Sequence, residues 1–195
     1  GAILLNDIKI LVIDEADRMM DMGFIPDIEK IVSLIPPNRQ TLLFSATMPP
    51  EIKRLSDKFL TNPKEISVSA PATTATNVEQ FLVHTTPRDK KKILGRLMRQ
   101  ESPKNAFVFL NRKRDIGDVA NFLKKEGYAA APLHGDMVQS ARTKTLQEFR
   151  DGTVKFLVCS DVAARGLDIS AVSHVFNYDV PMTPDDYVHR IGRTG

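Results

Sequence analysis

Short runs of apolar residues alternate with helical patterns along most of the 195-residue chain. The runs are continuous, so both faces of each run are apolar, which is typical of parallel strands covered by helices on both sides. The predicted strands are Ile10–Ile13, Thr41–Phe44, Ile66–Val68, Val78–Thr85, Ala106–Leu110, Tyr128–Leu133, Lys155–Cys159 and Val172–Tyr178. Repeated β-α-β units of this kind predict an α/β fold built on parallel sheets.

Three helices are predicted between the later strands. Arg88–Arg99 carries one apolar stripe at helical spacing. Arg114–Glu126 and Ala141–Arg150 are followed by Gly127 and Gly152, which we expect to end each helix as a C-terminal cap.

Residues 70–77 show no periodicity and no large apolar side chain, which predicts a flexible linker. The charge changes sign there: residues 1–77 carry 8 Lys+Arg against 10 Asp+Glu, net −2, and residues 78–195 carry 19 against 14, net +5. We therefore predict two α/β lobes, at 1–69 and 78–195. The first shows only three strands, whereas such a lobe needs on the order of 100 residues, so we expect its front to be missing and the chain to be a segment of a longer protein.

Composition excludes several classes of protein. No apolar run reaches the roughly 18 residues that a membrane span needs. The single Cys159 excludes a disulfide framework and a multi-cysteine zinc site, and favours a reducing, cytoplasmic setting. The basic second lobe indicates a polyanion partner, although a solvated lysine-rich helix face at Lys90–Lys92 explains part of the excess.

Polar residues follow the predicted strands, at the edge where ligands bind in open parallel sheets. They include Asp14-Glu15-Ala16-Asp17, Ser45-Ala46-Thr47, Asn111, His134-Gly135-Asp136 and Ser160-Asp161. In the first group, one carboxylate could hold Mg²⁺ through water while its neighbour activates an attacking water. The alternative is a plain helix start, since acidic residues are favoured there.

Other candidates also have ordinary structural explanations. Ser45 and Thr47 could simply cap a helix that begins near Pro49 and Pro50. The arginines of the segments 164–168 and 189–195 could stabilise a transferring phosphoryl group, but a single arginine is more often in a surface ion pair.

Taken together, six motifs resemble those of the DEAD-box ATP-dependent RNA helicases, in family order and over essentially the whole chain. They are Val12–Asp17, Ser45–Thr47, Phe107–Phe109, His134–Asp136 with Gln139 and Arg142, Ser160–Asp168 and His189–Gly195. The amino-acid sequences of these motifs are similar to those of the bacterial RhlE-like group. The resemblance implies two RecA-like lobes of the P-loop NTPase superfamily, the first truncated at its N-terminal side. It implies ATP and Mg²⁺ as cofactors and RNA as partner, with ribonucleoprotein partners in addition.

The resemblance also implies a role for particular residues at the ATP site. Asp14 matches the Mg²⁺-linked carboxylate, and Glu15 the group that positions or activates the hydrolytic water. Asp168 matches the contact to the ATP ribose, Gly166 matches a further nucleotide-binding position, and Arg193 matches an arginine finger on the γ-phosphate. Residues matching a relay between the ATP site and lobe closure are Asp17, Ser45, Thr47 and His189.

On the RNA side, five residues match elements that form or brace the backbone-binding surface: Gly135, Gln139, Arg142, Ser160 and Arg165. Contacts of this kind go to phosphates and 2′-hydroxyls, so the resemblance implies little preference for RNA sequence, in single strands or short duplexes.

Two departures from the family pattern limit what the segment itself should do. The chain has no glycine-rich P-loop with its phosphate-binding lysine, and the last motif stops at Gly195. We therefore expect the full-length parent to couple ATP hydrolysis to short-duplex unwinding or ribonucleoprotein remodelling, and the 195 residues alone to be inactive. The rival reading is a non-catalytic RNA clamp or scaffold of the same fold; a DNA helicase of a related superfamily is disfavoured by Asp14–Asp17 and Ser45–Thr47.

Overall fold

The chain forms two compact units, Gly1–Val68 and Ser69–Gly195, in a computed structural model. The structure describes residues 4–68, 78–164, 167, 169 and 172–194. The predicted linker at 70–77 lies outside these residues, so the predicted lobe boundaries stay a prediction. Each unit is described by itself.

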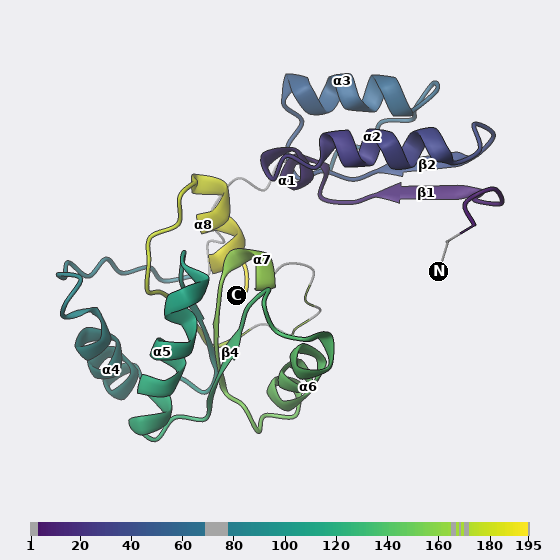
Figure 1. Ribbon diagram of the computed structural model, residues 1–195. Helices are drawn as coiled ribbons and strands as arrows, with labels where there is room; N and C mark the ends of the chain where they lie inside the picture. The colour runs from purple at the N-terminus through teal and green to yellow at the C-terminus, as the bar shows by residue number, and fades with distance from the viewer. Residues whose placement is uncertain (1–3, 69–77, 165–166, 168, 170–171, 195) are drawn as a thin grey trace. The chain divides into compact units, whose positions relative to one another are not determined.

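Unit 1 is a single β-α-β arrangement with its helices on one face of a two-stranded sheet (Figure 1). Its elements are β1 (Ile10–Ile13), α1 (Ala16–Asp21), α2 (Ile25–Leu34), β2 (Gln40–Leu43) and α3 (Pro50–Phe59). The strands are parallel, with Ile10 opposite Gln40 and Ile13 opposite Leu43.

The core of unit 1 lies between this sheet and the helices. Ile13 and, from α3, Ile52 and Leu55 are buried, and Leu11 and Leu43 pack against them. Alternate residues of a strand point to opposite faces, so Ile10 and Val12 face away from the core, and their side chains are 59% and 55% exposed. The prediction that helices cover both faces is therefore wrong for β1: in the described part of unit 1 the helices pack on one face only.

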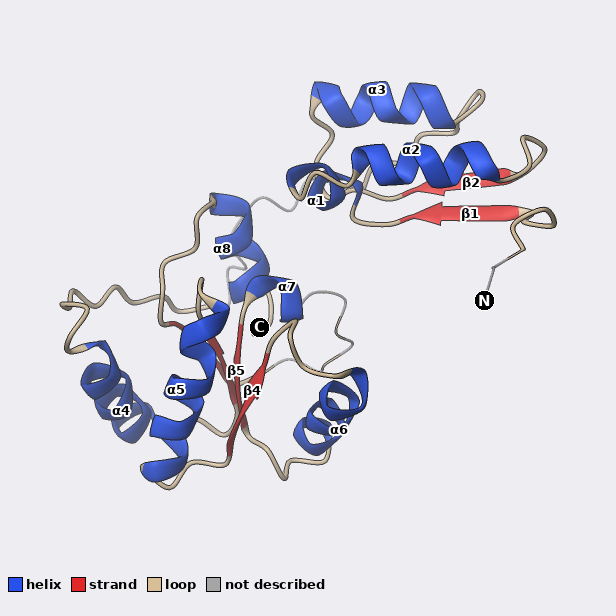
Figure 2. Ribbon diagram, in the orientation of Figure 1, coloured by secondary structure: helices blue, strands red, loops and turns tan. Residues whose placement is uncertain are grey.

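Unit 2 contains a four-stranded parallel sheet in the order β4-β5-β3-β6, with helices on both faces (Figure 2). Its elements are α4 (Lys90–Glu101), β3 (Ala106–Phe109), α5 (Lys113–Lys125), β4 (Ala130–Leu133), α6 (Gln139–Arg150), β5 (Phe156–Cys159), α7 (Asp161–Ala164), β6 (His174–Asn177) and α8 (Pro184–Ile191).

The central strands of unit 2 supply two hydrophobic cores, one on each face. From β3, Ala106 and Val108 enter the core with α4 and α5, whereas Phe107 and Phe109 enter the core with α6 and α7. Every residue of β3 and β5 is buried. The continuous apolar runs at these strands are explained by this two-sided burial, and the predicted parallel α/β class is confirmed.

The predicted helix ends of unit 2 are also confirmed. Gly127 follows α5 with φ +88°, and Gly152 follows α6 with φ +75°, a left-handed conformation that glycine adopts without a steric cost. The predicted strands at Ile66–Val68 and Val78–Thr85 are wrong, because both segments are irregular in the described chain. Neither segment pairs with a described strand, and their apolar side chains, such as that of Phe81, are exposed.

Leu123 provides a test of how much the core of unit 2 contributes to stability. Its side chain is fully buried on the stripe Ile116, Val119, Ala120 and Leu123 of α5. Leu123→Ala should lower the free energy of unfolding by about 3 kcal/mol, because it removes buried methyl groups and leaves a cavity. Urea denaturation followed by circular dichroism measures this; the exposed Leu82→Ala is the control and should change stability by less than about 0.5 kcal/mol. Equal losses in the two variants would contradict the assigned core.

Candidate functional site

The Asp14–Asp17 segment connects the end of β1 to the start of α1. Asp14 and Glu15 are exposed there, and the Asp14 Oδ1 atom accepts the backbone N–H of Glu15 at 2.9 Å. Glu15 adopts φ +51° and ψ +47°, the left-handed region, which costs a residue with a side chain about 1–2 kcal/mol. The turn is held between the strands, since Phe44 donates to Ile13 and Ala16 donates to Phe44 through backbone hydrogen bonds of 2.8 and 3.0 Å.

Asp17 is buried and ties this turn to the segment after β2. Its Oδ2 atom accepts both the backbone N–H and the hydroxyl of Thr47, at 2.8 and 2.9 Å. Its own N–H donates to the Ser45 hydroxyl oxygen at 3.1 Å. The structure thus brings Asp17, Ser45 and Thr47 together, as three of the four predicted relay residues.

The same contacts bear on the ordinary structural explanations for these residues. Helix α3 begins at Pro50 with Pro49 as its N-cap residue, and no side chain caps it, so the capping explanation for Ser45 and Thr47 is wrong. The helix-start explanation holds only in part for the acidic group: Asp17 does lie in the first turn of α1, but its carboxylate is committed to Thr47 and to the N–H of Arg18.

Two opposing effects set the protonation of Asp17. Burial raises the pKa of its carboxyl group, but hydrogen bonds from the Thr47 backbone and hydroxyl, the Arg18 backbone and the Ser45 hydroxyl stabilise the carboxylate. The net result is a pKa below its usual value of 3.8. Asp17 is therefore a fixed negative charge near neutral pH, suited to holding two loops together and not to exchanging a proton.

The predicted RNA-side residues lie at the ends of β4 and β5 in unit 2. Gly135 and Gln139 are exposed, the latter as the first residue of α6. The Arg142 Nη2 atom donates to the carbonyl of Ala163 in α7 at 2.8 Å, and the Ser160 carbonyl accepts the N–H groups of Ala163 and Ala164. Arg142 therefore braces α7 against α6. Arg165 lies outside the described residues.

Two of the predicted ATP-side and relay residues of unit 2 lie on or just after α8. His189 is exposed on α8, and the Arg193 Nη1 atom donates to the carbonyl of Leu167 at 3.1 Å. Gly166 and Asp168 lie outside the described residues. His189 belongs to unit 2 and Asp17 to unit 1, so their predicted connection stays a prediction.

Arg190 is the residue that sequence reasoning missed. The sequence predicts a surface ion pair for a single arginine in the segment 189–195. Instead, the Arg190 side chain is 1% exposed and forms hydrogen bonds with groups at three strand ends. The sequence does contain one signal for this burial. Hydrogen-bond acceptors such as Asn111 and Asp161 follow the predicted strands, and a buried guanidinium needs several acceptors.

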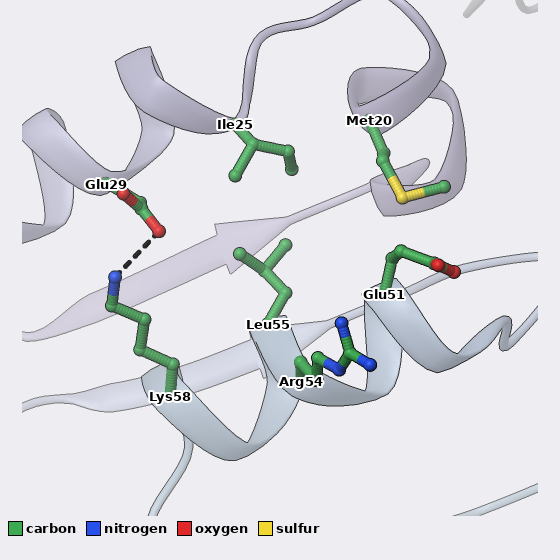
Figure 3. A pocket seen from close by; sticks show the side chains of 7 residues that line it. All are labelled: Met20, Ile25, Glu29, Glu51, Arg54, Leu55 and Lys58. Carbon is green, nitrogen blue, oxygen red and sulfur yellow. Dashed lines mark hydrogen bonds and ion pairs between the residues drawn. The ribbon is translucent and has the colours of Figure 1, made fainter.

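Two further features of the described residues carry none of the predicted chemistry. Burial raises the pKa of the Cys159 thiol, so this cysteine stays protonated. A cavity of about 320 Å³ lies between α1, α2 and α3, lined by Met20, Ile25, Glu29, Glu51, Arg54, Leu55 and Lys58 (Figure 3). None of the predicted site residues lines it.

Within the described part of the chain no helix is long and apolar enough to cross a membrane, and no three His, Cys, Asp or Glu side chains gather as a metal cluster.

Comparison with known proteins identifies the class. The family described as "DEAD/DEAH box helicase" matches residues 2–55, and the "Helicase conserved C-terminal domain" matches residues 89–195. The chain therefore belongs to the DEAD-box helicase family.

Individual relatives support this assignment. The DEAD-box ATP-dependent RNA helicase CshA of Bacillus subtilis is 50% identical over 193 residues, which are 99% of this chain and 39% of that protein. CshA of Geobacillus kaustophilus is 47% identical over 195 residues, which are 42% of its length. The chain thus spans about two fifths of the curated relatives it matches. Because these bacterial relatives are named CshA, assignment to a RhlE-like group stays a prediction.

Solved structures confirm the RecA-like fold class. Dbp5 of S. cerevisiae bound to RNA and ADP BeF3 matches with a TM-score of 0.84 and 32% identity, over 98% of this chain and 51% of that one. A DEAD box protein from Methanococcus jannaschii matches with a TM-score of 0.59 and 37% identity, over 99% of this chain and 52% of that one.

The Asp17 contacts lead to a prediction about stability and pH. Asp17→Asn removes a charged acceptor from Thr47, so it should lower the free energy of unfolding at pH 7 by about 1.5–3 kcal/mol. Because the folded-state pKa is lowered, this contribution is fully present above the unfolded pKa of about 4 and is lost as pH falls through the folded value. The difference between wild type and variant should therefore shrink below pH 4.

Urea denaturation at pH 7, 5 and 3 measures the effect. Asp21→Asn is the matched control, since Asp21 is exposed on the same helix. A pH-independent gap between wild type and Asp17→Asn would show that the carboxylate charge is not what holds Thr47.

Proposed function

We propose that this chain is the part of an ATP-dependent RNA helicase that joins the hydrolytic carboxylates to the RNA-binding lobe. The parent protein hydrolyses ATP and uses it to separate short RNA duplexes or remodel ribonucleoprotein. The observation that carries the proposal is the cluster of Asp17, Ser45 and Thr47 directly beside the exposed Asp14-Glu15 pair. The Asp17 contacts attach the turn that carries Asp14 and Glu15 to the segment after β2. The two carboxylates are therefore held at a fixed place, as positioning a reacting group requires.

Asp14 and Glu15 take different roles in this proposal. Asp14 offers carboxylate oxygen, which Mg²⁺ prefers, and its exposed position at the end of β1 fits a contact through water. Bound Mg²⁺ would supply charge neutralisation for the triphosphate. Glu15 is exposed on the same turn and orients the attacking water or accepts its proton. The left-handed backbone of Glu15 is held by its neighbours, as expected where a site needs a fixed side chain.

We also propose that residues of unit 2 take part in ATP binding and hydrolysis. Arg193 supplies positive charge to the γ-phosphate, Asp168 and Gly166 contact the nucleotide, and His189 joins the relay of Asp17, Ser45 and Thr47. The fit of Arg193 is supported by its intermediate exposure and by its hydrogen bond to the Leu167 carbonyl, which orients the side chain. That the similar yeast structure holds both RNA and ADP BeF3 supports ATP as the cofactor of this site.

RNA binds to the surface formed by the ends of β4 and β5. Gly135 and Gln139 are exposed there, Ser160 follows β5, and Arg142 braces α7. Arg165 lies outside the described residues and is included because it matches the family motif. Arg142 fixes α7 in place, and the backbone at Gly135 is exposed. A fixed surface with exposed backbone suits contacts to phosphates and 2′-hydroxyls, which carry little sequence information. We further propose lobes at 1–69 and 78–195 joined by residues 70–77, and a cytoplasmic setting in keeping with the single buried Cys159.

The assignment of Glu15 is tested by Glu15→Gln in the full-length parent. ATP and RNA binding should be retained, because the side chain keeps its size, and hydrolysis should fall by about 10²-fold or more, because a positioned base is lost. Phosphate release with saturating RNA measures the rate, and Glu51→Gln, an exposed glutamate on α3, is the matched control. Wild-type turnover in Glu15→Gln would favour the non-catalytic clamp.

RNA binding by unit 2 is tested through its salt dependence. Affinity for a single-stranded RNA should fall linearly on a log–log plot as salt rises, with a slope of about −0.7 for each phosphate contacted. Fluorescence anisotropy with two RNAs of unrelated sequence and one DNA analogue measures this. The two RNAs should bind alike and the DNA more weakly, since it lacks 2′-hydroxyls. Affinity that ignores salt, or that differs greatly between the RNAs, would refute the proposed surface.

A further inference from the structure

Arg190 is a buried arginine that lies on α8 between two proposed functional residues, His189 on the helix and Arg193 just after it. It follows His189 directly and precedes Arg193 by three positions, near the end of α8. With 1% of its side chain exposed, it is among the largest fully buried side chains in the described chain. Burying a guanidinium costs free energy unless its N–H donors form hydrogen bonds. The partners of these donors therefore indicate which parts of the fold Arg190 holds together.

The guanidinium forms a bidentate ion pair with the residue that begins α7. Its Nε and Nη2 atoms donate to the two carboxylate oxygens of Asp161, at 2.6 and 2.8 Å. Asp161 comes two residues after the last residue of β5. This pair therefore fixes α8 to the end of the second strand of the sheet.

The remaining donors of Arg190 reach the ends of two more strands. Nη2 donates to the Asn111 side-chain oxygen at 2.8 Å, after β3, and Nη1 donates to the Asp179 carbonyl at 2.6 Å and to the Asn177 side-chain oxygen at 3.2 Å, at β6. All five guanidinium N–H donors are thus used, and the group also lies 5.1 Å from the centre of the Phe109 ring. Lysine has three donors and no planar fork, so it cannot reproduce this pattern.

The backbone of Arg190 connects this anchor to Arg193. Helix α8 ends at Ile191, and the N–H of Arg193 donates to the Arg190 carbonyl at 3.2 Å. The carbonyl of Arg193 in turn accepts the N–H of Val172 at 2.8 Å. The position of Arg193 relative to the sheet is therefore set through the residue whose side chain grips three strand ends.

We propose that Arg190 is a positioning residue for ATP hydrolysis, which acts through Arg193 by fixing the end of α8 to the ends of β3, β5 and β6. Its own side chain touches no nucleotide. The inference rests on the proposed function, in which Arg193 stabilises charge on the transferring phosphoryl group. Stabilisation of this kind depends on placement: a misplacement of about 1 Å can cost as much as 10²-fold in rate.

The experiment compares Arg190→Lys, Arg193→Gln and the double variant in the full-length parent, with saturating RNA. Arg190→Lys should lower kcat by about 10- to 100-fold and leave KM for ATP within about twofold, because placement in the transition state is lost and ground-state binding is not. The double variant should be no slower than Arg193→Gln alone. Arg96→Lys, an exposed arginine on α4, is the matched control and should behave as wild type.

Thermal unfolding of each variant separates this role from a purely structural one. A structural role would lower the melting temperature of Arg190→Lys and leave kcat unchanged when it is measured well below that temperature, which would overturn the inference. If Arg190→Lys does not fold, Asn111→Ala, which removes one of the five acceptor contacts, decides by the same split between kcat and KM.

The outcomes also separate this inference from the proposed function. Full activity in Arg193→Gln would remove the role of Arg193 and the inference with it. Loss of activity in Arg193→Gln together with wild-type kcat in Arg190→Lys would overturn the inference alone. A double variant that is slower than Arg193→Gln by the full factor of Arg190→Lys would show that the two arginines act independently, and would also overturn it.

Discussion

Parallel hydrogen bonding between four-residue strands is the constraint on which the rest of this molecule depends. Because all strands of a unit point the same way, the segments that leave them emerge at one edge of the sheet. The apolar residues within the strands secure that arrangement by burial, most completely in β3 and β5. The polar residues that follow the strands are not needed for this burial, so they can take part in binding or catalysis.

The two units hold these strand ends together by the same physical means, a buried charge with all its partners supplied. In unit 1 the charge is the carboxylate of Asp17, which accepts hydrogen bonds from Thr47. In unit 2 it is the guanidinium of Arg190, which is bonded to Asp161 and to groups on two other strands. Each charge is surrounded by acceptors or donors from segments distant in sequence, so each fixes the relative position of loops that the strands alone leave free.

Sequence reasoning succeeded where the information is local and failed where it depends on distant neighbours. The buried strands of unit 2 and the glycines at the ends of α5 and α6 follow from continuous apolar runs and from φ preferences, both visible in a short window. The segments Ile66–Val68 and Val78–Thr85 have the composition of strands but do not pair with a described strand, and pairing depends on distant neighbours that composition does not reveal.

The candidate site divides in the same way. Asp14 and Glu15 could be placed at a strand end from their position alone, whereas the contacts of Ser45 and Thr47 with Asp17 needed either the family resemblance or the structure, since helix capping explained them equally well. Arg190 was missed because the burial of an arginine depends on acceptors from positions 111 to 179, which no local pattern brings together.

The grip of Arg190 on three strand ends has a consequence for how unit 2 comes apart. A surface helix secured only by an apolar stripe can detach while the rest of a domain stays folded, because such local opening costs less than global unfolding. Here, detaching α8 would also break the bidentate ion pair of Arg190 with Asp161 and its three further hydrogen bonds to the ends of β3 and β6. Because these bonds tie α8 to three strand ends, we expect the helix to open together with the central strands and not on its own.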